Sequence, residues 1–333
     1  MRRGTRFGVA LAAVSALVAS CGSPTSAGPA SGEDAPASGT LIVNGAGTLA
    51  RPFKAVIAAF TTRNPDVTVE SRFAGSVEVV RGITELDMPV DVLGVADYSL
   101  IPEMMFGAGG GPRFADWYIG FVSNRITFAY TDQSNGAAEL TTDNWREVMS
   151  RPGVRIGRSN PDTDPSGYQT LQMLALAQDY YDEPKLSAEV LANSPRETMV
   201  DTETHLLPAL VSGQIDYLGI YRSDALQHDL RFIDLPPQID LSDPAQADAY
   251  ESASVPTASG TRTGKPIVYA LTIPTNAPNT AAAQRFVEFV LSSDGQKIMS
   301  DNGFTVLDPA VAGGESLPTS LRPLAAPAAL PGG

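Results

Sequence analysis

The stretch Leu41-Ile42-Val43-Asn44-Gly45-Ala46-Gly47-Thr48-Leu49 contains the repeating unit of the fold. Its first three residues form a short apolar run, which is typical of a buried strand. Glycines at 45 and 47 then indicate a turn, and apolar residues recur at helical spacing over residues 49–62. The stretch therefore predicts a strand that passes through a tight turn into a helix, with Thr48 at the junction.

The same unit recurs along the chain, and this alternation of strands and helices predicts an α/β fold. Ligands of open α/β sheets collect where strands end and helices begin, so we expect Thr48, Ser76 and Asp97 near one edge. Further predicted strands cover 67–73, 90–95, 126–130, 215–221 and 266–274, and further predicted helices cover 77–86, 170–181, 204–211 and 280–291.

About 290 ordered residues exceed one comfortable hydrophobic core, so we expect two lobes. The extended runs 126–130 and 267–273 are the expected crossovers between them. A chain that crosses twice makes a hinged cleft. The expected domains are lobe 1 at 41–127 plus 269–310, lobe 2 at 128–268, and a loosely held tail rich in Pro, Ala and Gly at 311–333.

The first twenty residues predict export. Arg2, Arg3 and Arg6 precede an uncharged apolar run at 7–19, which is typical of a signal peptide and too short for a permanent membrane span. Small residues before Cys21, the only cysteine, resemble a bacterial lipobox. We expect cleavage of 1–20, a lipid anchor on Cys21 at the outer face of the plasma membrane, and a flexible tether at 21–40; the alternative is an ordinary secreted protein.

The chain is acidic, with a formal charge of −14 that becomes about −17 once the three arginines of the signal are removed. Such a surface repels nucleic acid and anionic lipid headgroups, so neither is an expected partner. A local pocket of donors can still bind an anion where it is shielded from the surrounding carboxylates, because screening acts over roughly 8 Å. The acidic composition therefore does not exclude an anion ligand.

The loop Ser159-Asn160-Pro161-Asp162-Thr163-Asp164-Pro165-Ser166-Gly167-Tyr168 opens directly onto a predicted helix. Asp164 has the character of an N-cap, and Pro165 and Ser166 that of a first turn. The unpaired backbone N–H groups of such a turn either receive an oxyanion or simply start a helix. Residues of this one loop do not decide between the two.

Several segments, in their order and spacing, resemble the molybdate/tungstate-binding proteins of ABC importers, closest to the archaeal-type tungstate-binding branch, from about residue 41 to 304. The resemblance implies a type II periplasmic binding protein fold, in which two α/β lobes joined by a two-strand hinge close on one tetrahedral dianion. It also implies delivery to a permease and ATPase complex by a monomer without a cofactor. The segments include Gly45-Ala46-Gly47-Thr48-Leu49, Ala74-Gly75-Ser76-Val77, Val95-Ala96-Asp97-Tyr98 and Asp164-Pro165-Ser166-Gly167-Tyr168.

By this resemblance the oxyanion is bound by residues from both lobes, and metal enters only inside the bound anion. Thr48, Ser76 and Asp164 have an alternative interpretation as helix caps, and Tyr221 as a core residue. The implied ligand-binding residues are Thr48, Ser76, Asp164, Ser166, Glu203 and Tyr221.

One position departs from the archaeal branch, which has Glu immediately before the tyrosine where this chain has Ile220. Isoleucine cannot ligate a metal, so we expect the anion to be held by hydrogen bonds with four oxygens around its metal. Such anions offer only acceptors, and each charge-assisted bond contributes about 1.5–3 kcal/mol. Phosphate carries a proton and needs an acceptor, which a carboxylate turned into the pocket would supply. Three roles stay open for Asp164: it caps its helix, faces the metal of the anion, or accepts the phosphate proton.

Other functions remain open at this point. Phosphate, sulfate or an organic acid would suit a binding protein of the same fold. An exported hydrolase is less favoured, because the chain has no Gly-x-Ser-x-Gly segment and its two histidines, His205 and His228, have no zinc-binding pattern. We therefore expect a binding protein without catalytic residues.

Overall fold

The computed structural model describes residues 37–107, 110–327 and 330. The predicted signal peptide, Cys21 and all but the last four residues of the predicted tether lie outside this part of the chain. The tether was expected to reach residue 40, but β1 already begins at Gly39 and pairs with β2. Among the described helices none combines the length and apolar character needed to cross a membrane.

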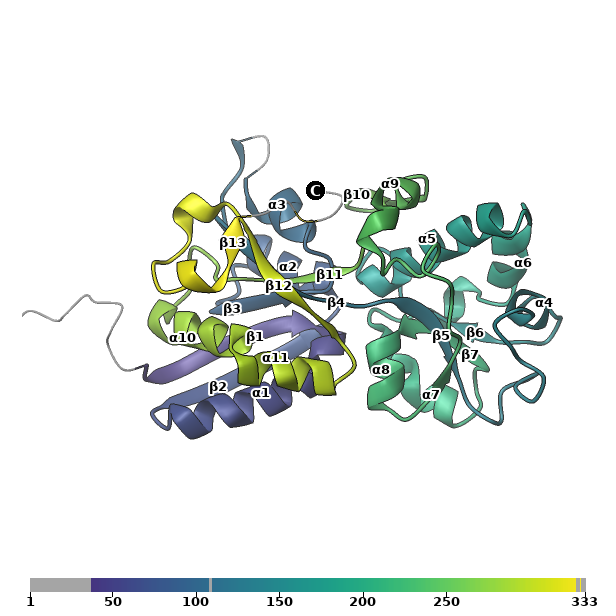
Figure 1. Ribbon diagram of the computed structural model, residues 1–333, viewed down its shortest axis with the longest axis horizontal. Coiled ribbons are helices and arrows are strands. Elements are labelled where there is room, and N and C mark those ends of the chain that lie inside the picture. Colours follow the sequence, from purple (N-terminus) through teal and green to yellow (C-terminus); the bar gives the residue numbers. More distant parts are fainter. Residues whose placement is uncertain (1–36, 108–109, 328–329, 331–333) are drawn as a thin grey trace, which may run out of the picture. The chain divides into compact units, whose positions relative to one another are not determined.

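A seven-stranded sheet in the order β13-β12-β4-β11-β3-β1-β2 forms what we call lobe 1 (Figure 1). β1 runs parallel to β2 and β3, whereas β11 runs antiparallel to β3 and β4. Its strands are β1 Gly39–Ala46, β2 Val67–Ala74, β3 Val92–Val95, β4 Tyr118–Ser123, β11 Val268–Thr272, β12 Thr305–Ala312 and β13 Ala326–Pro327, and its helices are α1 Ala50–Arg63, α2 Ser76–Thr84, α3 Leu100–Met105, α10 Thr280–Leu291 and α11 Ser293–Asp301.

A four-stranded sheet in the order β6-β7-β5-β8, with the helices α4 to α8, forms what we call lobe 2. Its strands are β5 Ile126–Tyr130, β6 Ile156–Gly157, β7 Tyr217–Tyr221 and β8 Arg231–Phe232, and its helices are α4 Trp145–Met149, α5 Pro165–Tyr180, α6 Leu186–Ala192, α7 Leu207–Val211 and α8 Arg222–Gln227. Helix α9 Ala247–Tyr250 and the hairpin of β9 Ser254–Thr257 with β10 Gly260–Thr263 follow in the chain.

The chain passes between the two sheets twice. The chain leaves the first sheet at the end of β4, Ser123, and enters the second three residues later at Ile126; it returns as β11. Both sheets lie in one compact unit, residues 36–333. The predicted α/β class is confirmed, while the predicted lobe boundaries stay a prediction.

Aromatic packing fixes α1 on lobe 1, and with it the turn that carries Thr48. Phe53 and Phe60 of α1 are fully buried and meet Phe286 of α10 edge to face, with ring centroids 5.9 and 5.2 Å apart. Each such pair adds about 0.5–1.5 kcal/mol beyond the burial of area. The contacts of Phe53 and Phe60 with α10 therefore fix α1 on the sheet, and the turn at the start of α1 is fixed with it.

The segment after residue 310, expected to be loosely held, is packed as far as residue 327. The end of β12 pairs with β4, and Leu317 and Leu321 are buried. Pairing with β4 satisfies backbone groups of this segment, and the buried leucines add apolar contacts, so few apolar side chains are sufficient here.

Candidate functional site

Three of the predicted ligand residues lie at helix starts. Thr48 sits in the short 3₁₀ turn Gly47–Leu49 that leads into α1, Ser76 is the first residue of α2, and Asp164 is the N-cap of α5. The Asp164 carboxylate accepts a hydrogen bond from the Ser166 N–H at 3.4 Å. The Asp-Pro-Ser segment thus caps its helix as the sequence predicts.

The two lobe 1 hydroxyls are buried and already anchored. The Ser76 Oγ accepts a hydrogen bond from the Ala96 N–H at 3.0 Å, and the Thr48 Oγ1 lies 2.9 Å from the hydroxyl of Tyr269 on β11. Because Ser76 accepts this bond, its own proton remains a donor. These contacts fix both hydroxyls without filling their hydrogen-bonding capacity.

The lobe 2 residues form a second connected group. The Glu203 N–H, at the start of the 3₁₀ turn Glu203–Leu206, donates to the Asp164 carboxylate at 3.2 Å, and the Ser166 Oγ lies 2.8 Å from the Ser159 Oγ. The Tyr221 hydroxyl donates to the Gln169 side chain at 2.7 Å. Asp164 therefore ties the start of α5 to the turn that carries Glu203.

Direct contacts join the two groups. The Glu78 N–H of α2 donates to the Thr163 carbonyl at 3.4 Å, and the Tyr168 hydroxyl of α5 donates to Asp97 at 2.7 Å. The rings of Tyr221 and Tyr269 meet edge to face, with centroids 5.8 Å apart. All six predicted residues thus belong to one buried region that both lobes build.

Carboxyl groups without partners are the unexpected feature of this region. Neither carboxyl oxygen of Glu203 receives a hydrogen bond from an N–H or O–H of the described residues, although the side chain is 1% exposed. Burial, and then the neighbouring Asp164 charge, raise the pKa of Glu203 well above its usual range. Both effects favour the protonated form of Glu203.

Asp224, in the first turn of α8, behaves in the same way and is a residue that the sequence interpretation missed. One of its oxygens is buried without a partner, and burial together with the Asp164 charge raises its pKa to about 8. Its position four residues after Ile220 was visible in the sequence, but nothing there shows that its carboxyl turns inward. Ile220 itself lies in the core of lobe 2.

Further donors come from residues that the prediction also missed. The Asn124 amide, between β4 and β5, donates to the Ser223 hydroxyl at 2.8 Å and to that of Tyr269 at 3.4 Å. Burial is the main cause that raises the pKa of Tyr221 and Tyr269, so both hydroxyls stay protonated at neutral pH. The region therefore holds hydroxyls and carboxyls with raised pKa values, although the Tyr221 proton is already donated to Gln169.

A groove of about 400 Å³ reaches this region at Asp224. It runs between the turn that carries Gly47 and the turn that carries Thr204, and Arg51, Lys54 and His228 also line it. The two cations of α1 give the groove the polarity that attracts an anion. The groove is one approach to the buried region from the surface.

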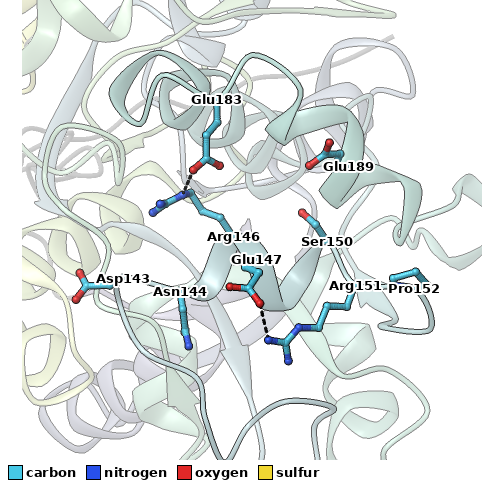
Figure 2. Close-up of a pocket in the computed structure, with 9 residues that line it drawn as sticks. All are labelled: Asp143, Asn144, Arg146, Glu147, Ser150, Arg151, Pro152, Glu183 and Glu189. Atoms are coloured by element: carbon cyan, nitrogen blue, oxygen red, sulfur yellow. Dashed lines mark hydrogen bonds and ion pairs between the residues drawn. The ribbon is translucent and has the colours of Figure 1, made fainter.

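A cavity of about 520 Å³ between α4 and α6 does not suit an anion (Figure 2). Its Arg146 pairs with Glu183 at 3.0 Å and its Arg151 pairs with Glu147 at 2.9 Å, and Glu189 is also part of its lining (Figure 2). Acids outnumber the arginines there. Among the described residues no group of three or more His, Cys, Asp and Glu side chains is arranged to hold a metal ion.

Two α/β lobes linked by two strand crossovers, with a donor-rich region between them, define a solute-binding protein with the type II periplasmic fold. A model of the bacterial extracellular solute-binding protein family matches residues 41–305, and the chain belongs to this family.

Individual relatives agree. The chain is 39% identical to a solute-binding protein of Petrotoga mobilis, covering 81% of this chain and 85% of the relative. It is 35% identical to the molybdate/tungstate-binding protein WtpA of Pyrococcus abyssi, covering 85% and 89%. The periplasmic molybdate-binding protein of Azotobacter vinelandii shares the fold, with a TM-score of 0.54, 18% identity, and coverage of 80% and 99%. The resemblance noted in the sequence is confirmed.

A substitution at Gly75 tests whether the two lobes contact each other in solution as they do in the structure. A Cβ at this residue would lie 2.3 Å from the Thr163 carbonyl oxygen and 2.8 Å from that of Asp201, whereas its φ of −56° suits alanine. We expect Gly75→Ala to hold the lobes apart, giving a larger radius of gyration by small-angle scattering, with the free energy of unfolding changed by less than about 1 kcal/mol. Gly314→Ala, which meets only an ordinary contact, is the control. Equal scattering from Gly75→Ala and wild type would contradict the closed contact.

Asp224 makes stability depend on pH. Its pKa rises from 3.8 to about 8 on folding, so the native state holds a proton that the unfolded chain releases, and stability falls as pH rises from about 4 to about 8. Asp224→Asn keeps the neutral form. We expect urea unfolding to show a gain of at least about 1 kcal/mol at pH 8 and almost none at pH 4, because one pKa unit corresponds to about 1.4 kcal/mol.

The control for this comparison is Asp66→Asn, which changes an exposed carboxylate. It should leave the pH profile as it is in the wild type. A gain for Asp224→Asn that is equal at both pH values would show that Asp224 is ionised in the native state.

Proposed function

We propose that the chain is the substrate-binding protein of an ABC importer and that it binds molybdate or tungstate in the region between the lobes. The observation that carries the proposal is the set of buried donors at Thr48, Ser76 and Ser166, each at a helix or turn start. The name of the Pyrococcus abyssi relative, a molybdate/tungstate-binding protein, supports the same ligand. The protein binds and releases its ligand without a chemical step.

The energetics of the proposed site do not require a cation. A tetrahedral dianion offers only acceptors, and each charge-assisted hydrogen bond contributes about 1.5–3 kcal/mol. Helix α5, with sixteen residues, adds the positive end of its dipole, which contributes up to about 2 kcal/mol in a partly buried site. The raised pKa values of Glu203 and Asp224, about 8 for Asp224, favour protonated carboxyls, which would donate to the anion and would not repel it.

Phosphate is the second candidate, and a specific observation favours it. Hydrogen phosphate carries a proton that needs an acceptor, and the partnerless carboxyl oxygens of Glu203 and Asp224 are buried acceptors. Molybdate and tungstate remain preferred because the pKa values of the same carboxyls are raised, which favours protonated groups that donate.

The proposal extends to the cell envelope. Removal of residues 1–20 and lipidation of Cys21 would leave the domain on the outer face of the plasma membrane, tethered by the segment before β1. Delivery to a permease and its ATPase follows from the role of solute-binding proteins in importers. We propose that the protein acts as a monomer, because one chain supplies both sides of the proposed site.

Isothermal titration against molybdate, tungstate, sulfate and phosphate tests the ligand. We expect tight binding of molybdate and tungstate, and a loss of about tenfold or more in Ser166→Ala, because one charge-assisted donor is removed. Ser212→Ala changes an exposed serine and serves as the control. Binding of phosphate alone would overturn the ligand assignment in favour of the second candidate.

X-ray absorption at the metal edge tests how the anion is held. Ile220 occupies a core position and offers no oxygen, so we expect four oxygen neighbours around tungsten or molybdenum. Six oxygen neighbours would mean that carboxyl oxygens, with Asp164 and Glu203 the nearest candidates, enter the coordination shell. That result would contradict binding by hydrogen bonds alone.

A further inference from the structure

Arg158 is a buried cation without a counter-ion. It follows β6 and is 9% exposed, and its Nε and Nη1 atoms donate no hydrogen bond within the part of the chain that the structure describes. Burial, and then the charge of Arg196, lower its pKa from the usual value, yet a guanidinium stays charged at physiological pH. An isolated buried charge is strongly unfavourable, so an anion that approaches the guanidinium through a cavity lined by Arg158 would stabilise it.

The structure has space for such an anion beside Arg158. Arg158 lines a cavity of about 170 Å³. A water molecule takes up about 30 Å³ of the liquid, so the cavity holds a small anion with a few waters and is too small for a nucleotide. The other side chains around it include Arg196 and Asp162, and the apolar walls of Pro161, Leu171 and Met199.

The charges in the cavity favour an anion. Two guanidinium groups face one carboxylate, and that carboxylate is engaged elsewhere, because Asp162 accepts a hydrogen bond from the Ala258 N–H at 2.7 Å. Among the described ion pairs neither Arg158 nor Arg196 has an acidic partner. Arg196 is exposed, so a ligand can enter from its side.

The cavity is separate from the region between the lobes. Ser159 turns its hydroxyl to Ser166 at 2.8 Å and bridges to Val200, so the chain is extended at this point. Consecutive side chains of an extended segment point to opposite faces, which directs Arg158 away from the oxyanion site. We propose that this cavity is a second anion site, which binds an oxyanion of the size of phosphate through Arg158 and Arg196.

Titration with inorganic phosphate tests the second site in protein already saturated with tungstate. We expect one equivalent of phosphate to bind the wild type and to raise its melting temperature, because a ligand of the native state stabilises it. Arg196→Ala should weaken this binding at least about tenfold. Arg158→Leu should abolish it and should raise the melting temperature in phosphate-free buffer, because an unpaired buried charge is removed.

A control variant and one comparison show whether phosphate binds at this cavity. Arg231→Ala removes an arginine of lobe 2 that is paired with Asp132, and it should leave phosphate binding unchanged. Phosphate bound between the lobes, should tungstate not be the ligand there, would be insensitive to Arg158→Leu and Arg196→Ala, so the two sites are distinguished. Absence of phosphate binding in the wild type, or equal binding by wild type and Arg196→Ala, would overturn the proposal.

Discussion

The rest of the site depends on the hydrogen bonds that the buried Asp164 carboxylate accepts. It caps α5 through the Ser166 N–H and holds the Glu203 N–H at 3.2 Å, so one buried side chain fixes two separate segments of lobe 2. Burial, and then the Asp164 charge, raise the pKa values of the neighbouring Glu203 and Asp224. Losing this carboxylate would therefore disturb both the positions of these segments and the pKa values of the two carboxyls.

The proposed donors between the lobes are hydroxyls, and the nearby Lys265 is paired with Asp97 at 3.6 Å. Two arginines line other spaces: Arg51 lines the approach groove and Arg158 lines the separate cavity. Such a division suits a protein that must release its ligand, because a fixed counter-ion would retain a dianion more firmly than hydrogen bonds do. It also leaves discrimination among anions to the size and proton content of the ligand.

The parts of the structure that depend on local sequence were predictable. Helix α10 spans the predicted residues, and the Asp164 cap follows from the Asp-Pro-Ser segment, because both depend on neighbouring residues. The roles of Asp224 and Tyr269 were not predictable, since their neighbours in space are distant in sequence. Composition indicated a loosely held tail, whereas Val311 and Ala312 pair with β4 and Leu317 and Leu321 are buried, through contacts with residues distant in the sequence.

A crystal structure of the mature domain with tungstate, located by its anomalous scattering, tests the central claim most directly. We predict one tungsten peak between the lobes, with oxyanion atoms at hydrogen-bonding distance from the hydroxyls of Thr48, Ser76 and Ser166 and no lysine or arginine in contact. A peak beside Arg51 and Lys54 in the groove, or none at all in protein that binds tungstate in solution, would contradict it.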